Sequence, residues 1–462
     1  MQHPDQHNPQ HATSVLVITC ISSFLTPFNG SSINIALPSI GSEFTADAIT
    51  LSWIATSFLL ATAIFMVPLG RLADIYGMKK MIVTGLIVYI FAALLAAVAS
   101  SIMMLLAARV IQGIASAMIS STGSALLVLA FPLKQRGRVL GINVAVVYVG
   151  LSLGPFVGGL LTQVLGWRSI FWLITALGII PMVMIFWLLK GEWAAARGEK
   201  FDLPGSIIYG LGLVALIWGF SALPDWTGFA AVALSIMILG IFVKWELKVK
   251  SPALDIKHFI INRGFAFANL AALINYAATY AVTFLLSLYL QYIKGLPPGN
   301  AGLVILVMPV IQAVFSPITG RLSDRFDPRL LASTGMALTM AGLLLLVFLD
   351  GSLPLYYIII SLIVLGLGFA LFSSPNTNSV MSSVNRESLA VASATLGTMR
   401  LIGQMLSMGT AMLVLAVIIG HTPITETIFP QFELSVKICF GIFTVLCFGG
   451  IFASMARGQA RR

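Results

Sequence analysis

Charge is scarce in this chain of 462 residues, since only 9% of them are Asp, Glu, Lys or Arg and 58% are hydrophobic. Soluble domains carry about 25% charged residues and about 45–50% apolar ones. The shortage of charge therefore excludes a fold whose main solvent is water. Several uncharged stretches reach the ~20 residues that a helix needs to cross a bilayer, so the sequence indicates an integral membrane protein.

Cysteine and catalytic motifs are also scarce. Cys20, Cys439 and Cys447 lie in apolar segments without a Cys-x-x-Cys spacing, which supports neither a disulfide framework nor a metal cluster. The chain has no P-loop and no nucleophile beside a base in a known motif. We expect no metal, no cofactor and no enzymatic activity, and this chain alone cannot be an ATP-driven pump.

Hydropathy, with Pro and Gly read as breaks, predicts an all-α polytopic membrane protein with fourteen spanning helices. The predicted helices lie near 13–40, 48–70, 80–100, 102–131, 139–163, 167–189, 204–222, 228–245, 264–292, 299–320, 330–349, 353–375, 388–420 and 434–456.

Basic residues predict the orientation of these helices. If both termini are cytoplasmic, 21 of the 26 Lys and Arg residues fall on the cytoplasmic side, as the positive-inside rule requires. These cations are spread over short loops, so the net charge of +10 does not indicate a nucleic-acid partner. We expect a multi-pass protein of the cell membrane, with the lipid bilayer as its surroundings.

One charged hinge occurs in each half of the chain. Gly70-Arg-Leu-Ala-Asp-Ile-Tyr-Gly-Met-Lys-Lys80 is repeated in outline as Gly320-Arg-Leu-Ser-Asp-Arg-Phe-Asp-Pro-Arg329. Such duplication is typical of transporters built from two similar halves. We expect a tail at 1–12, a six-helix bundle at 13–190, two inserted peripheral helices with linkers at 191–263, a second six-helix bundle at 264–456 and a tail at 457–462.

Six stretches carry a family resemblance. The hinge at 70–80 resembles the signature loop of the major facilitator superfamily. Further stretches resemble motifs of its fourteen-helix drug:proton antiporter branch, namely Asn34-Ile-Ala-Leu-Pro38, Ala108-Arg-Val-Ile-Gln-Gly113, Gly150-Leu-Ser-Leu-Gly-Pro-Phe-Val-Gly-Gly159 and Arg400-Leu-Ile-Gly-Gln-Met-Leu-Ser-Met-Gly409, with Gly166-Trp-Arg-Ser-Ile-Phe171 between them. The resemblance covers nearly the whole chain. It implies two bundles that rock about a central site.

The resemblance implies that the hinge is a latch, in which Asp74 matches the family's acid. A carboxylate at a helix end can accept hydrogen bonds from a facing helix N-terminus or pair with an arginine. Ile75 and Met78 stand where the family usually has basic residues, and a loop that only fixes the topology is the alternative. We assign gating roles to Gly70, Arg71, Asp74, Gly77, Lys79, Gly320, Asp324 and Arg325.

Glycines in the fifth predicted helix repeat every four residues, at Gly150, Gly154 and Gly158. They share one helix face, where two backbones can approach closely, and Pro155 adds a kink. With Gly159 they resemble the antiporter motif of exporters, which favours export over uptake. A helix interface alone is the alternative interpretation.

Two cations, Arg109 and Arg400, fall inside predicted helices, whereas no Asp or Glu does. A charge there is costly and usually faces a cavity or a partner; an arginine bonded to helix carbonyls is the alternative. Where the branch commonly has an Asp in the first helix, this chain has Asn29, which cannot titrate. This departure argues against ordinary proton antiport and against cationic substrates, which need a buried negative partner.

Neutral polar and aromatic side chains complete the predicted cavity, and Tyr276 and Tyr280 share a helix face there. The predicted lining is Asn29, Asn34, Trp53, Arg109, Gln112, Asn275, Tyr276, Tyr280, Gln312, Arg400 and Gln404. We expect a monomeric secondary exporter of small amphipathic molecules, neutral or anionic. A passive facilitator, a proton-coupled exporter of cations and a sensor that does not transport remain as alternatives.

Overall fold

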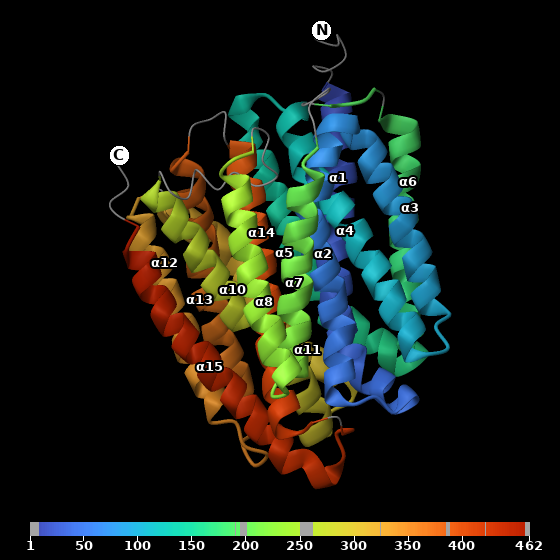
Figure 1. Ribbon diagram of the computed structural model, residues 1–462, viewed down its shortest axis with the longest axis vertical. Helices are drawn as coiled ribbons and strands as arrows, with labels where there is room; N and C mark the ends of the chain where they lie inside the picture. The colour runs from blue at the N-terminus through green and yellow to red at the C-terminus, as the bar shows by residue number, and fades with distance from the viewer. Residues whose placement is uncertain are drawn as a thin grey trace.

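The computed structural model describes residues 9–189, 191–194, 201–249, 262–323, 325–384, 389–420 and 422–457. Within these ranges fourteen helices are long and apolar enough to cross a membrane, which confirms the predicted fold class. Figure 1 shows the helices side by side, with the beginning of α1 and the end of α15 at the same end of the bundle. We refer to that end as the predicted cytoplasmic end and to the opposite one as the predicted outer end.

Six helices form the first half. They are α1 (Pro9–Phe44), α2 (Ala48–Tyr76), α3 (Met78–Ala97), α4 (Ile102–Ala130), α5 (Leu133–Leu165) and α6 (Arg168–Leu188). Side chains cap two of them at the predicted outer end, since Asp47 accepts from the backbone N–H of Thr50 and Ser101 from that of Met104. Such caps satisfy backbone donors that a helix cannot satisfy itself.

The remaining helices begin with the inserted pair, α7 (Leu203–Ala222) and α8 (Trp226–Glu246). The second half follows with α10 (Arg263–Leu288), the π-helical turn η2 (Tyr289–Ile293), α11 (Pro298–Ser323), α12 (Pro328–Val347), α13 (Leu355–Ser382), α14 (Leu389–Ile418), the short η4 (Glu426–Ile428) and α15 (Phe429–Met455).

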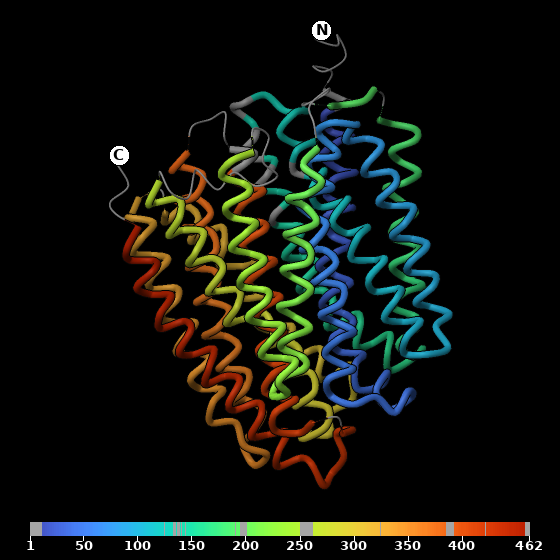
Figure 2. Tube along the Cα trace, in the orientation of Figure 1, coloured from blue at the N-terminus to red at the C-terminus, as the bar shows by residue number. Residues whose placement is uncertain are grey.

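The two halves repeat one packing pattern. In the first half α5 packs on α1, α4 on α2, α3 on α4, and α6 on both α3 and α1. The same five pairs recur in the second half as α14 on α10, α13 on α11, α12 on α13, and α15 on both α12 and α10. Figure 2 traces the halves as two groups of helices, blue to green and yellow to red.

Helix pairs related by the same repeat join the halves. α5 packs on α11, and its counterpart α14 packs on α2. α7 lies against both α2 and α14, and α8 packs on α7. In Figure 1 this pair crosses the front of the bundle between α2 and α10. Among the described spanning helices, α8 has the smallest share of buried residues in its most apolar stretch, 22%. α7 therefore covers the seam between α2 and α14, while α8 lies at the surface of the bundle.

Three predicted helix ends were wrong by six or seven residues, and all three lie at charged or proline-containing segments. α5 begins at Leu133 instead of the predicted residue 139. α2 continues from the predicted end at residue 70 to Tyr76, so most of the predicted hinge is helical and Gly77 alone separates α2 from α3. α13 continues past Pro375 to Ser382. A proline within a spanning helix is tolerated because neighbouring groups satisfy the freed backbone carbonyl.

Three acidic residues predicted to lie in loops lie inside the ends of helices. Glu43, Glu246 and Glu433 were expected in loops, but they lie in the terminal turns of α1, α8 and α15. In the part of the chain that the structure describes, no carboxylate lies in the middle of a spanning helix.

Candidate functional site

At the predicted outer end, α1 and α10 close the space between the halves. The Ser287 hydroxyl of α10 donates to the Asn34 carbonyl of α1 at 2.7 Å, and the Gln291 amide donates to the Ile35 carbonyl at 3.0 Å. Both bonds use backbone carbonyls, so they hold two helices together without any charged partner.

α5 and α11 close the same end on the other side of the bundle. The Gln163 side chain accepts a hydrogen bond from the Gly299 backbone N–H at 3.1 Å. A Cβ on Gly159 would lie 2.5 Å from the Pro298 carbonyl oxygen, and one on Gly302 would overlap the Pro155 carbonyl. These glycines therefore allow the two backbones to touch across the halves.

Burial along α1 and α10 shows how far this closure extends. Residues 28–38 of α1 and 284–290 of α10 and η2 are buried without exception. Nearer the predicted cytoplasmic end, α1 buries only one face, at Val15, Ile18, Thr19, Ser22 and Leu25. The halves thus enclose each other at the outer end and separate toward the cytoplasmic end along α1.

In the first half, Arg109 of α4 is 0% exposed. Its Nε donates to the Ile54 carbonyl at 3.0 Å, and its Nη1 donates to Asn29 Oδ1 at 3.0 Å and to Gln112 Oε1 at 2.9 Å. The guanidinium lies 4.4 Å from the centre of the Phe58 ring. The arginine is therefore held by neutral acceptors and an aromatic face, and three predicted cavity residues meet here.

Tyr89 of α3 extends this network. Asn29 Nδ2 donates to the Tyr89 hydroxyl at 3.0 Å, and the hydroxyl donates to the Leu25 carbonyl at 3.2 Å. From the second half Tyr280 approaches the same level, since its hydroxyl lies 3.6 Å from a Cβ built on Gly30. Asn29 therefore links Arg109 to Tyr89 through its oxygen and its nitrogen.

In the second half, Arg400 of α14 is only half-buried. Its Nη2 donates to Thr377 Oγ1 of α13 at 2.7 Å, and its guanidinium lies 5.6 Å from the centre of the Tyr276 ring. That ring meets Phe369 edge to face at 5.2 Å. No carboxylate of the described residues forms an ion pair with Arg400.

Tyr148 of α5 connects the first half to α13 near Arg400. Its hydroxyl shares a hydrogen bond of 2.6 Å with Ser373 of α13. One turn along α13, Thr377 Oγ1 donates to the Ser373 carbonyl at 2.8 Å. A polar bridge between the halves therefore lies one helical turn from the side chain that holds Arg400.

Other predicted cavity residues lie outside these two clusters. Asn34 lies in the closed outer interface, and Trp53 packs with the apolar cluster that α7 forms on α2 and α14. Asn275 and Gln312 are buried with side-chain atoms that lack a hydrogen-bond partner, and Gln404 is half-buried.

Sequence reasoning missed Tyr89, Tyr148, Ser373 and Thr377. The two tyrosines carry hydroxyls in the middle of apolar helices, which is a usable signal because a buried hydroxyl requires a partner. The two α13 residues lie in the polar run at 373–379. The predicted helix ends at Pro375, so the prediction leaves Thr377 outside the helix.

The glycine repeat of α5 packs on α1. A Cβ on Gly150 would lie 2.8 Å from the Phe24 carbonyl, one on Gly158 would lie 2.6 Å from Ser32 Cβ, and one on Gly154 would overlap the Ser31 hydroxyl. The repeat therefore forms a helix interface within the first half, whereas Gly159 faces the other half.

The first hinge is tied to the segment that follows α6. Glu192 accepts from the backbone N–H of Lys79 at 2.7 Å and from that of Lys80 at 3.3 Å, while the Lys79 ammonium donates to the Leu189 carbonyl. Gly77 has φ 121°, and a Cβ there would overlap the Glu192 carboxylate. Glu192 therefore caps α3 and requires glycine at position 77.

The other hinge residues lie as follows. Gly70, Arg71 and Asp74 belong to the last turns of α2, Gly320 lies in the last turn of α11, Arg325 follows that helix, and Asp324 is outside the described residues.

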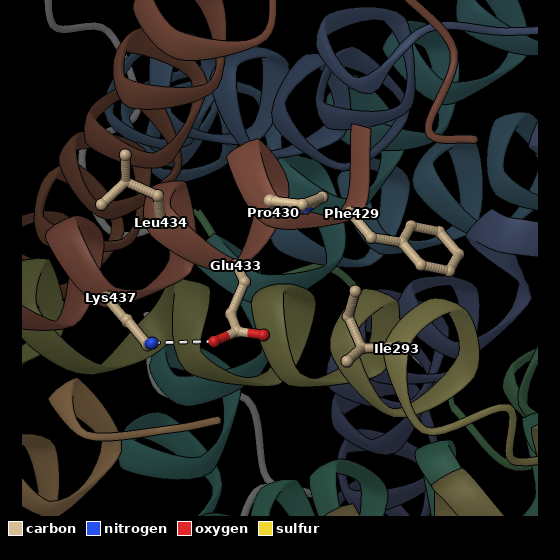
Figure 3. A pocket seen from close by; sticks show the side chains of 6 residues that line it. All are labelled: Ile293, Phe429, Pro430, Glu433, Leu434 and Lys437. Carbon is tan, nitrogen blue, oxygen red and sulfur yellow. Dashed lines mark ion pairs between the residues drawn. The ribbon is translucent and has the colours of Figure 1, made fainter. Parts of the chain in front are cut away.

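A separate hollow of about 420 Å³ opens at the predicted outer end. Its lining is Ile293, Phe429, Pro430, Glu433, Leu434 and Lys437 (Figure 3). Glu433 and Lys437 neutralise each other there in an ion pair of 2.7 Å. Its elements, η2 and α15, contribute none of the residues of the two arginine clusters.

Comparisons with known proteins agree with this arrangement. A sequence model of the Major Facilitator Superfamily matches residues 19–408 and 268–458. The riboflavin transporter RibZ of Clostridioides difficile is 28% identical over 84% of this chain and 84% of its own. The multidrug resistance protein Stp of Mycobacterium tuberculosis is 29% identical over 88% of this chain and 76% of its own.

A solved structure has the same fold. It is a bacterial homolog of the human lysosomal transporter Spinster, in an inward-facing and unoccupied conformation. The TM-score is 0.70 at 16% sequence identity, over 97% of this chain and 98% of that one.

Proposed function

The chain belongs to the Major Facilitator Superfamily, and on this premise we propose that it exports small amphipathic molecules, neutral or anionic, by alternating access between its two halves. As a member of a transporter family it is a multi-pass membrane transport protein and not an enzyme.

One observation supports the proposed substrate class. Arg109 and Arg400 lie within spanning helices, and neither forms an ion pair with a carboxylate of the described residues. An uncompensated cation at low dielectric repels a cationic substrate and attracts an anionic one. Neutral molecules remain acceptable because aromatic side chains such as Tyr276 and Phe369 offer apolar contact.

The contacts between the halves support alternating access. α5 with α11 and α14 with α2 are equivalent pairs, so the halves can rock about one axis while each keeps its internal packing. The outer end is closed by hydrogen bonds to backbone carbonyls, which can break without stranding a buried charge.

Uphill flux would test the proposal. The purified protein is reconstituted into liposomes and offered riboflavin, which the name of one relative suggests, an aromatic carboxylate and a quaternary ammonium ion. We expect transport of the first two kinds of solute and little of the third. Accumulation against a gradient separates active export from passive facilitation, and an imposed pH gradient tests proton coupling. Absence of flux for every solute would favour a sensor.

We also propose that the protein lies in the cell membrane as a monomer, with both termini cytoplasmic. Asp225 and Lys80 are exposed at opposite ends of the bundle. In a background without the three native cysteines, a reagent that cannot cross the membrane should label Asp225→Cys in intact cells and spare Lys80→Cys. The reverse pattern would contradict the orientation.

A further inference from the structure

The two intramembrane arginines differ in how far their donors are satisfied. An arginine has five N–H donors. Arg109 is fully buried and makes three hydrogen bonds to neutral acceptors, while its Nη2 is buried without an acceptor. Arg400 is half-buried and makes one, to Thr377, and its Nε–H is enclosed without an acceptor. Arg400 therefore retains most of its capacity to bind an anion.

Two aromatic rings lie near the Arg400 guanidinium. The Tyr276 ring lies beside the guanidinium and meets Phe369 edge to face. Close packing fixes the ring position, since a Cβ on Gly403, one turn after Arg400, would lie 2.9 Å from Tyr276 Cβ. The arrangement presents a cation and an apolar aromatic wall next to each other.

The first half takes part through Tyr148, which hydrogen-bonds Ser373 one turn from Thr377. A molecule held at Arg400 would therefore lie beside a contact between the halves.

We propose that Arg400, Thr377, Tyr276 and Phe369 form a subsite for the negatively charged group of an aromatic ligand, with Arg400 binding the anion and the rings binding the aromatic body. The inference rests on the proposed function and deepens it, because it assigns anion binding to Arg400 rather than to Arg109. A carboxylate suits the planar guanidinium because the two can form parallel hydrogen bonds.

Paired probes test this subsite by direct binding to the full-length protein in lipid nanodiscs. The probes are naphthalene carboxylate and its neutral carboxamide, which share one ring system. Because charge-assisted hydrogen bonds are stronger than neutral ones, the wild type should bind the carboxylate at least about tenfold more tightly. Arg400→Gln should remove that preference and leave the affinity for the carboxamide within about twofold.

Three further variants separate effects on the proposed subsite from effects on the whole protein. Arg400→Lys keeps a charge and should keep part of the preference, which also shows that the position tolerates change. Tyr276→Ala should weaken both probes, because it removes ring contact. Lys437→Gln removes a cation at the predicted outer end of the same half and should leave the preference intact.

Several results would overturn the subsite. They are equal affinity of the wild type for both probes, no binding of the carboxylate, a preference that survives Arg400→Gln, and a preference lost equally in Lys437→Gln. Flux distinguishes this failure from failure of the proposed function. If liposomes with wild-type protein still transport riboflavin or the carboxamide, export stands without the subsite; if the carboxylate binds through Arg400 but no solute crosses, the subsite stands without export.

Discussion

Arg109 and Arg400 show that a cation within a membrane helix can serve two purposes. Arg109 joins α4 to the α2 backbone and to Asn29 of α1, so it ties three helices of the first half together. Arg400 has a single hydrogen bond and stays partly accessible. The first environment is typical of a structural arginine and the second of a binding residue.

This contrast predicts different costs of substitution. Arg109→Gln leaves the Ile54 carbonyl and the Asn29 and Gln112 side chains without their donor, and unpaired buried groups cost about 1–3 kcal/mol each. We expect a loss on the order of 3 kcal/mol for Arg109→Gln and below about 1 kcal/mol for Arg400→Gln. Thermal unfolding of the purified variants measures both, and equal losses would contradict the distinction.

Asn29→Asp should make the first half more tolerant of cations. A carboxylate at this position would lie next to Arg109 Nη1, which now donates to Asn29 Oδ1 at 3.0 Å, and would offset its charge. At about 10 Å and an effective dielectric near 20, one unit charge is worth about 1.7 kcal/mol, or somewhat more than tenfold in affinity.

Tetraphenylphosphonium, a permanent cation, can report this change in proteoliposomes. The wild type should export it poorly, Asn29→Asp should improve export, and Asn29→Ala, which removes the side chain without adding charge, should not. Robust export of the cation by the wild type would contradict both the predicted substrate class and the role given to Asn29.

At the scale of single elements, the sequence predicted fourteen helices well, because each needs only an apolar run between charged or breaking residues. It failed where local signals compete with tertiary contacts. Pro375 does not end α13, and polar residues as far as Ser382 continue the helix. Apart from Gln112, the hydrogen-bond partners of Arg109 and Arg400 come from other helices. Spacing could therefore identify the arginines but not Thr377, nor Tyr89, which is connected to Arg109 through Asn29.

The junction of α2 and α3 depends on one glycine and one carboxylate. Gly77→Ala should cost about 1 kcal/mol for the positive φ and more for overlap with Glu192. Glu192→Ala should cost about 1 kcal/mol because α3 loses its cap. In the double variant the overlap disappears, so the combined loss should fall short of the sum by about 0.5 kcal/mol or more.

Gly295→Ala provides the control for this double-mutant cycle of Gly77 and Glu192. Gly295 has φ 63°, and apart from its chain neighbours no other atom lies within 4 Å of a Cβ built there, so Gly295→Ala should carry the backbone cost alone and add independently to Glu192→Ala. Thermal unfolding of the single and double variants gives both coupling energies. Equal coupling in the two cycles would show that Glu192 does not determine the residue at position 77.

At the scale of the whole molecule, the repeat explains why the most extensive contacts between the halves form two equivalent seams. α5 with α11 and α14 with α2 are equivalent, and α7 covers only the second seam by contacting α2 and α14. No local sequence pattern fixes how an inserted helix pair docks, since its apolar surface suits lipid and protein alike.

Locking the outer end should stop transport without stopping binding. Gln163 and Gly299 touch across α5 and α11, so cysteines at both positions, in a background without native cysteines, should form a disulfide. The oxidised variant should retain binding of naphthalene carboxylate in nanodiscs, because Arg400 of α14 takes no part in this contact between α5 and α11, and should lose flux in liposomes. Reduction should restore flux, and each single cysteine variant should transport before and after oxidation. Full flux in the oxidised double variant would mean that α5 and α11 do not separate during the cycle, and alternating access would then require a different outer opening from the one that these contacts close.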